Sequence, residues 1–189
     1  REYQYAGIEM PKEIARCLIA GMVSDTLNLS SPTTSDLDRE ILPWLCEAAG
    51  VDAAQFTLDF FASGSLLAHN TALAAVAADR KVFEENGAKV SISHVEECGL
   101  DLFAKRREDL DATLDELIEV KGYDLALLIV TDIISHYSVF LASGDEKIID
   151  ALPYDRADDG VFHGPGVVSR KKQVFPAVCQ ALRVAAAQR

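Results

Sequence analysis

A nearly continuous run of apolar residues constrains the fold of this chain more than any other feature. The run extends from Leu125 to Val130 and is followed by Thr131-Asp132-Ile133. A short run without polar alternation predicts a strand that is buried on both faces. The sequence therefore predicts a central strand in a sheet that has helices on its faces.

Further strands and helices are predicted on either side of this run. Residues 80–85 and 89–94 read as the two strands of a hairpin, because Asn86-Gly87 between them is a strong signal for a tight turn. Residues 137–142 are a second β-like run. Amphipathic patterns predict a long helix over 100–120, a short helix over 145–152 and an acidic, glycine-containing loop over 153–166. This order predicts an α/β fold with a mixed sheet flanked by helices.

The beginning of the chain is predicted to be helical. One helix opens at Pro11 and has an apolar stripe made by Ile14, Leu18, Ile19 and Met22. A second runs from Ser35, an N-cap, toward Gly50, and Pro43 either bends it or marks a later start. A third spans residues 52–62, with Phe56, Phe60 and Phe61 facing inward. Ser63-Gly64-Ser65 is a natural hinge.

Three consecutive cations, Arg170, Lys171 and Lys172, stand out in a chain of net charge −12. A β-prone Gly-Val-Val precedes them, and an apolar pattern of helical period follows at Val174, Val178, Leu182 and Ala185. Free backbone N–H groups at the N-terminus of a helix that follows a strand attract an anion. The planar guanidinium group of an arginine suits phosphate oxygens. The alternative is a solvated basic turn before a terminal helix.

Composition narrows the remaining classes of function. The acidic balance argues against nucleic acid, whose phosphates need a basic surface, but a small phosphate ligand needs only a local cluster of cations. No apolar run approaches the roughly 20 residues that a membrane span requires. Four scattered cysteines without a C-x-x-C pair favour reduced thiols and a cytoplasmic setting. The histidines lie far apart without metal-binding spacing and are interpreted as surface or loop residues: His69, His94, His136 and His163.

The segment Ser169-Arg170-Lys171-Lys172-Gln173 resembles the C-terminal signature of the manganese-dependent (family II) inorganic pyrophosphatases, members of the Asp-His-His (DHH) phosphoesterase superfamily. Two further segments agree in type and order. Ser24-Asp25-Thr26, with the preceding helix, is similar to the end of the family's catalytic domain, and Asp79-Arg80-Lys81-Val82-Phe83 resembles its Asp-x-Lys-x-Phe pattern. The resemblance covers nearly the whole chain, from about Gly7 to about Leu182.

The resemblance implies a division of the chain and roles for four residues. Residues 1–54 correspond to the tail of the DHH catalytic domain, and residues 55–189 to the DHH-associated C-terminal substrate-binding domain. The resemblance implies that Asp25 is a manganese ligand, whereas the residues alone favour ordinary hydrogen bonding at a helix end. Lys81, Arg170 and Lys171 are implied to be catalytic residues that bind the phosphates of the substrate. Taken alone, Lys81 is an exposed strand lysine, and Asp132 is a turn-capping aspartate whose position also allows a catalytic role.

The resemblance further implies an inorganic diphosphatase that hydrolyses pyrophosphate by a two-metal mechanism as a homodimer, with Mn²⁺ as cofactor and Mg²⁺ or Co²⁺ as substitutes. The family's Asp-His-His triplet is absent from this sequence. We therefore expect a C-terminal fragment that is inactive alone, with most of its metal ligands upstream. The alternatives are a related exopolyphosphatase-type phosphoesterase and a stand-alone, non-catalytic phosphate-binding module. An Asp-His-His triplet in the upstream coding sequence decides for an enzyme.

Overall fold

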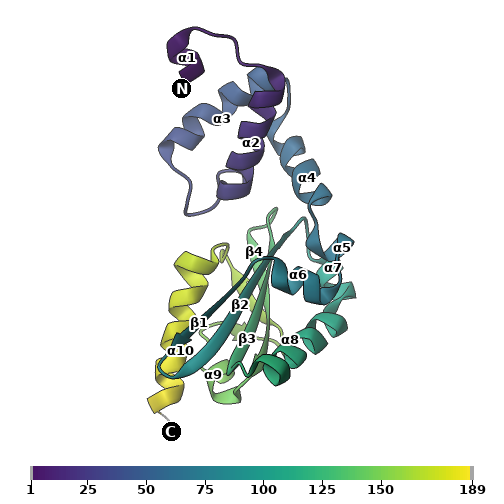
Figure 1. Cartoon of the computed structure of the whole chain (residues 1–189), viewed down its shortest axis with the longest axis vertical. Coiled ribbons are helices and arrows are strands. Elements are labelled where there is room, and N and C mark those ends of the chain that lie inside the picture. The colour runs from purple at the N-terminus through teal and green to yellow at the C-terminus, as the bar shows by residue number, and fades with distance from the viewer. Residues whose placement is uncertain (1, 188–189) are drawn as a thin grey trace. The chain divides into compact units, whose positions relative to one another are not determined.

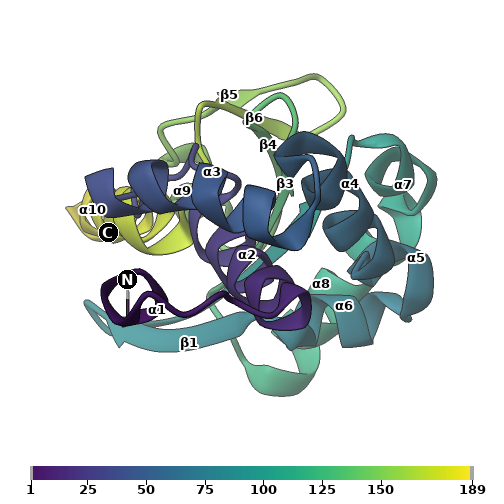
Figure 2. The same ribbon diagram turned by 90° about the horizontal axis from the view of Figure 1, so that it is seen from above.

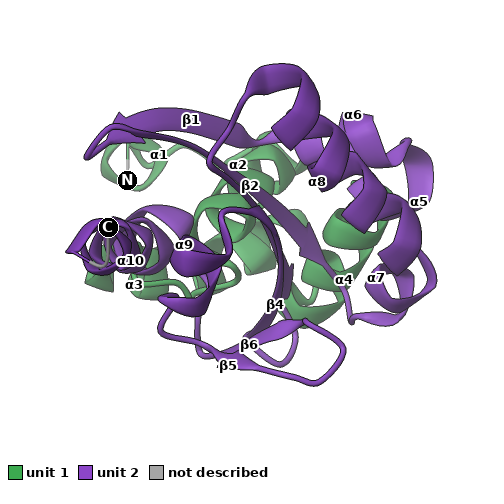
Figure 3. Ribbon diagram, turned by 90° about the horizontal axis from the view of Figure 1, so that it is seen from below, with its two compact units in different colours: residues 1–64 green, residues 65–189 purple. Residues whose placement is uncertain are grey.

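The computed structural model describes residues 2–187 of the chain. These residues fall into two compact units, and the division lies between Gly64 and Ser65 (Figure 3). The division coincides with the hinge predicted at Ser63-Gly64-Ser65, whereas the boundary implied by the resemblance lies between residues 54 and 55. The first unit is helical, and the second contains the sheet (Figures 1 and 2).

Helices α2 and α3 pack side by side in the first unit, with α4 against both. The Ser35 hydroxyl accepts from the amide of Asp38, whose carboxylate accepts from the Ser35 amide at 2.8 Å, so a reciprocal capping box starts α3. Pro43 lies inside α3, which excludes the predicted later start. The helices are α1 (Glu2–Ala6), α2 (Lys12–Thr26), α3 (Asp36–Ala49) and α4 (Ala53–Ser63).

The buried stripe of α2 differs from the predicted one. Ala15, Ile19 and Val23, spaced four residues apart, are fully buried, whereas Ile14 and Leu18 are 42% and 47% exposed. Residues four apart lie on one face of a helix, and the small Ala15 side chain lets a neighbouring helix approach that face closely. Because apolar residues flank this stripe, periodicity alone did not distinguish which of two adjacent rows is buried. Of the aromatics predicted to face inward from α4, Phe61 is buried, and Phe56 and Phe60 are half-buried.

Six strands of residues 65–187 form one mixed sheet in the order β1-β2-β3-β4-β6-β5. Strands β2 and β3 are parallel, and the other neighbours are antiparallel. The predicted α/β fold with a mixed sheet is therefore confirmed, as is the Asn86-Gly87 hairpin. All residues of β3 are buried, as the apolar run predicts. The strands are β1 (Arg80–Glu85), β2 (Ala88–Glu97), β3 (Leu125–Asp132), β4 (Tyr137–Gly144), β5 (Asp155–Arg156) and β6 (Phe162–Pro165).

Helices cover both faces of this sheet (Figures 1 and 3). One face packs against α5 (Leu66–His69), α6 (Ala72–Ala78), α7 (Asp101–Lys105) and α8 (Arg107–Lys121). The other packs against α9 (Glu146–Asp150) and α10 (Phe175–Ala187). The predicted stripe is buried: Val178, Leu182 and Ala185 lie in α10, and Val174 lies directly before it. Strands β5 and β6 lie in the segment predicted as a loop. They were not predicted because they are too short to show a periodic pattern.

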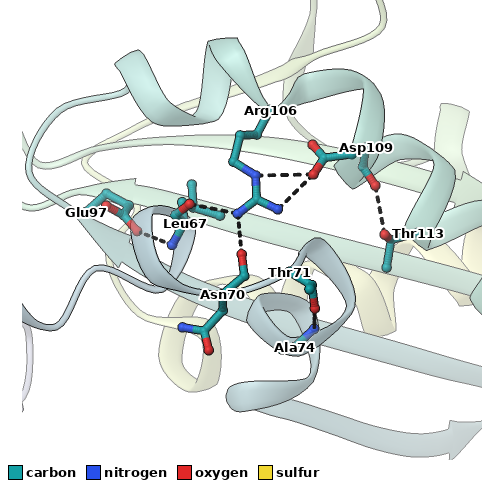
Figure 4. A network of polar contacts seen from close by, with 8 residues as sticks. All are labelled: Leu67, Asn70, Thr71, Ala74, Glu97, Arg106, Asp109 and Thr113. Carbon is teal, nitrogen blue, oxygen red and sulfur yellow. Dashed lines mark hydrogen bonds and ion pairs between the residues drawn. The ribbon is translucent and has the colours of Figure 1, made fainter.

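The helix predicted over residues 100–120 is divided at Arg106 into α7 and α8. The Arg106 guanidinium donates to the carbonyl oxygens of Leu67 and Asn70, both at 2.7 Å, and pairs with Asp109 at 2.7 Å (Figure 4). Leu67 lies within α5 and Asn70 caps its end, so both carbonyls are far from Arg106 in the sequence. A tertiary contact therefore accompanies the break, and an amphipathic pattern cannot reveal such a contact.

A buried carboxylate ties α5 to the sheet on the same side (Figure 4). Glu97, at the end of β2, is 3% exposed. Its two oxygens accept from the Ser65 hydroxyl at 2.7 Å and from the Leu67 amide at 3.0 Å. A buried charge is tolerated when such hydrogen bonds satisfy it. Glu97 thereby fixes the first residues of the second unit to the end of a central strand.

Candidate phosphate-binding site

Ser169 caps a π-helical turn, η1 (Arg170–Val174), that continues directly into α10. The side chains of Ser169 and Gln173 stabilise this turn through hydrogen bonds to the backbone. The Ser169 hydroxyl accepts from the amide of Lys172 at 3.3 Å. The Gln173 side chain accepts from the amides of Val168 and Ser169, both at 2.9 Å, and donates to the Gly166 carbonyl. Ser169 and Gln173 thus form a frame, and the three cations lie between them.

Arg170 reaches from this turn to the start of the edge strand β1. Its Nη1 atom donates to the Asp79 carbonyl oxygen at 2.5 Å, and Nη2 lies 2.9 Å from the Asp79 carboxylate. The Arg170 side chain is 16% exposed and the Asp79 side chain 50%. Two positions that are distant in the sequence therefore meet, and the meeting point lies two residues before Lys81.

Lys81 lies on the face of the sheet that α10 covers. It pairs with Ile92, and Phe83 pairs with Val90, and directly opposed residues of antiparallel strands share a face. Ile92 and Val90 belong to the core beneath α10, and the Phe83 ring packs against Phe175 of α10 at 4.7 Å between centroids. Arg170, Lys171 and Lys81 thus arise from elements on one face of the sheet, although no contact joins Lys81 to the other two.

Lys81 and Lys171 are exposed. Within residues 2–187, neither ammonium group has a hydrogen-bond or ion-pair partner. Of Lys81, Arg170 and Lys171, Arg170 is held in place by its contacts with Asp79. Two mobile point charges beside one fixed planar fork can adapt to an anion that carries several oxygens.

His94 lies beneath Arg170 in β2, which corrects its interpretation as a surface or loop histidine. Its side chain is half-buried and its Nε2 atom lies 2.8 Å from the Thr131 hydroxyl. Burial, together with the positive charge of Arg170, lowers the pKa of His94 from 6.5 to about 4, although Asp79 acts in the opposite direction. His94 is therefore neutral near pH 7.

Glu96 follows on the same side of β2 and completes the polar surroundings of this edge. Burial and the neighbouring charge of Asp79 raise the pKa of Glu96 from 4.5 to about 7. Sequence reasoning missed Asp79, His94 and Glu96 as neighbours of Arg170. The available signal was strand parity, because His94 and Glu96 share a face of β2 with Ile92.

Asp132 serves as a turn cap, which is the simpler of the two interpretations of its position. Its carboxylate accepts from the amides of Gly99 at 2.9 Å and Ile134 at 3.0 Å, and also from the Ser135 hydroxyl. Burial alone would raise the pKa of Asp132, but these hydrogen bonds outweigh burial and lower it. The carboxylate is occupied in holding the β2 and β3 ends together.

Asp25 is exposed near the end of α2, in the first unit. Its carbonyl oxygen accepts from the Thr33 hydroxyl at 2.7 Å, so the segment after the helix folds back on it. Divalent manganese favours several oxygen or nitrogen ligands. Among residues 2–187, no group of three or more His, Cys, Asp or Glu side chains could hold a metal ion.

The second unit is thus an α/β domain with helices on both faces of a mixed sheet. The family model of the DHHA2 domain matches residues 58–181, and the chain belongs to this family. None of the helices within residues 2–187 is long and apolar enough to cross a membrane.

The relatives agree with this assignment. The chain is 37% identical over 178 residues to a Lactococcus lactis protein named "Probable manganese-dependent inorganic pyrophosphatase", covering 93% of this chain and 56% of that protein. A Streptococcus agalactiae protein of the same name is 35% identical, with 93% and 57% covered. The chain thus spans little more than half the length of these curated relatives.

A solved structure supports the same relationship. The crystal structure of a Methanococcus jannaschii protein described as a "putative family II inorganic pyrophosphatase" superposes with a TM-score of 0.77 at 31% identity, over 93% of this chain and 57% of that one. The resemblance inferred from the sequence motifs is therefore confirmed for the chain as a whole. The roles of Asp25, Lys81, Arg170 and Lys171 stay predictions.

Proposed function

We propose that this chain is the substrate-binding C-terminal part of a manganese-dependent inorganic pyrophosphatase. We further propose that Arg170, Lys171 and Lys81 bind pyrophosphate. The proposal is supported by the contact of Arg170 with Asp79. This contact brings the Ser169–Gln173 turn to the strand that carries Lys81. The names of the relatives favour pyrophosphate over the longer polyphosphates that an exopolyphosphatase would take.

Arg170, Lys171 and Lys81 are proposed to bind the phosphates in different ways. Arg170, already oriented by Asp79, presents its remaining donors to the phosphate oxygens, and Lys171 and Lys81 approach as point charges from the turn and from β1. Their positive charge would also offset negative charge that develops on the leaving phosphate. Hydrogen bonds to charged groups contribute roughly 1.5–3 kcal/mol each, so losing the Arg170 side chain should weaken binding by at least about tenfold.

Hydrolysis of pyrophosphate is proposed for the whole protein, in which bound manganese ions would supply an activated water. Asp25 is the one ligand that we assign to this chain, and its partners would come from outside residues 2–187. The whole protein is further proposed to be a cytoplasmic homodimer. A stand-alone, non-catalytic phosphate-binding module is the second candidate.

Calorimetric titration of this chain with pyrophosphate tests the proposal. We expect binding that weakens in Arg170→Ala, Lys171→Ala and Lys81→Ala. Lys105→Ala is the matched control, because Lys105 is an exposed lysine on α7, which covers the opposite face of the sheet. Equal affinity in all four variants would remove the proposed binding role.

An assay of phosphate release separates the enzyme fragment from a complete enzyme. We expect no hydrolysis of pyrophosphate by this chain, with or without Mn²⁺. Turnover that copurifies with the chain through a sizing column, and disappears in Arg170→Ala, would overturn the fragment assignment. Sequencing the coding region upstream of residue 1 then distinguishes an enzyme fragment from a stand-alone module, since an Asp-His-His triplet there supports the enzyme.

A further inference from the structure

We propose that His94, Thr131 and Ser138 form a hydrogen-bonded chain that positions the Arg170–Lys171 turn for its anion. The inference rests on the proposed function only for the identity of that anion. The three side chains come from β2, β3 and β4 and lie on the face of the sheet beneath η1. Thr131 and Ser138 are fully buried, so they act through the turn and not by contact with a ligand.

The chain crosses the sheet in three links. His94 Nε2 lies 2.8 Å from the Thr131 hydroxyl, which lies 2.7 Å from the Ser138 hydroxyl. Ser138 in turn donates to the carbonyl oxygen of Val167, which precedes the cationic turn. A side chain at one end of the row is thereby connected to the backbone that leads into Ser169.

The direction of each proton follows from counting donors. A carbonyl oxygen only accepts, so the single Ser138 proton points to Val167. Thr131 must then donate its single proton to Ser138, and the Thr131 oxygen must accept from His94. The chain therefore requires a proton on His94 Nε2, and neutral His94 must be the Nε2–H tautomer.

The peptide that receives this chain is held from both sides. The Val167 carbonyl accepts from Ser138, and the Val168 amide of the same peptide group donates to Gln173 at 2.9 Å. Fixing both polar groups of one peptide plane fixes its orientation. The next residue is Ser169, whose hydroxyl caps the turn, so this orientation sets where Arg170 begins.

His94 also anchors the other side of the site. Its backbone amide donates to the Asp79 carbonyl oxygen at 3.1 Å, and the same oxygen accepts from Arg170. The backbone of His94 therefore fixes the partner of Arg170, while its side chain begins the row that fixes the turn. One residue thus sets the two ends of the contact between η1 and β1.

The first test needs no substitution. The ¹⁵N chemical shifts of the His94 ring, measured by NMR at pH 7 on this chain, report the tautomer. We expect a protonated Nε2 and an unprotonated Nδ1. An Nδ1–H tautomer would overturn the proposed chain of donors, whatever the affinity for pyrophosphate.

The second test removes the central link. Ser138→Ala deletes the donor to Val167, and we expect the Nε–H signal of Arg170 to shift and the dissociation constant for pyrophosphate to rise about fivefold to tenfold, the cost of about one hydrogen bond. Ser93→Ala is the matched control, because Ser93 is buried on the opposite face of β2 and its hydroxyl has no partner within residues 2–187. An unchanged Arg170 signal in Ser138→Ala would overturn the inference.

The third test uses rescue at the first link. His94→Leu removes the donor to Thr131 and should weaken binding as Ser138→Ala does. His94→Gln keeps an N–H donor of similar reach and should restore both the Arg170 signal and the affinity to within about twofold. Equal losses in the two variants would contradict a positioning role. If the unmodified chain binds no pyrophosphate, the proposed function fails for this chain, while the tautomer and the Arg170 signal still decide the positioning role.

Discussion

Arg170 grips Asp79 through two atoms of its guanidinium group, one on the backbone carbonyl and one on the carboxylate, at 2.5 and 2.9 Å. Arg170 lies in the turn before the last helix, and Asp79 directly precedes the first strand. It orients the one cation of the site that the structure fixes, and it leaves Lys81 and Lys171 free to adapt to a ligand.

The two-atom contact predicts that Arg170 cannot be replaced by lysine. Arg170→Lys keeps the charge but provides a single point of donation, so it should lose the contact with Asp79 and raise the dissociation constant for pyrophosphate at least about tenfold. Arg183→Lys, on an exposed part of α10, should bind as the unmodified chain does. Wild-type affinity in Arg170→Lys, measured by calorimetry, would show that charge alone is sufficient.

Glu97 is predicted to stabilise the second unit through its two hydrogen bonds. Glu97→Gln leaves one oxygen, so either the Ser65 hydroxyl or the Leu67 amide loses its acceptor, at a cost of about 1–3 kcal/mol in the free energy of unfolding. Glu108→Gln, an exposed position at the start of α8, should change it by less than about 0.5 kcal/mol. Urea denaturation followed by circular dichroism measures both, and equal values would contradict the role of Glu97.

Gly144 is predicted to accept no side chain. Its φ angle is +132°, and an added Cβ would lie 2.2 Å from the Asp124 carbonyl oxygen. Gly144→Ala should therefore cost more than about 4 kcal/mol or prevent folding, as buried backbone clashes do. Gly87→Ala is the matched control, since Gly87 also has a positive φ of +77° but nothing within 4 Å, and about 1–2 kcal/mol is expected. Similar melting temperatures in the two variants would contradict the clash.

His94 is predicted to make stability fall in acid. Its pKa is 6.5 when exposed and about 4 in the folded chain, so between these values the unfolded state binds a proton that the folded state does not. Its contribution is fully present above pH 6.5 and is lost as pH falls toward 4. The free energy of unfolding should therefore decrease more steeply in the unmodified chain than in His94→Gln over this window, and parallel curves from urea denaturation would contradict the prediction.

Glu96 is predicted to act in the opposite sense. Because its pKa rises from 4.5 to about 7 on folding, the folded state holds a proton that the unfolded state has released. Its contribution to stability is present below pH 4.5 and is lost as pH rises through 7. Relative to Glu96→Gln, the unmodified chain should lose stability between these values. Asp79→Asn should lower the pKa of Glu96, measurable by carboxyl ¹³C NMR, and an unchanged value would exclude Asp79 as a cause.

Local chemistry in the sequence determined most elements of the fold. The apolar run of β3, the Asn86-Gly87 turn, the Ser35 cap and the stripe of α10 were each readable because a few neighbouring residues specify them. The short strands β5 and β6, the division of the long helix at Arg106 and the buried row of α2 were not, since distant partners decide them. The Ser169–Gln173 motif likewise predicted a relationship that the family model and the relatives confirm.

Only the tertiary structure decided which residues surround the cations. The sequence shows Arg170, Lys171 and Lys172 in a row, but it did not indicate that Arg170 meets Asp79. Nor did it indicate that His94, Thr131 and Ser138 align across three strands. Such contacts depend on strand order and register, which arise from the packing of the whole sheet. A residue's type and spacing can suggest its chemistry, but its partners are set by chain segments that approach one another only in the folded state.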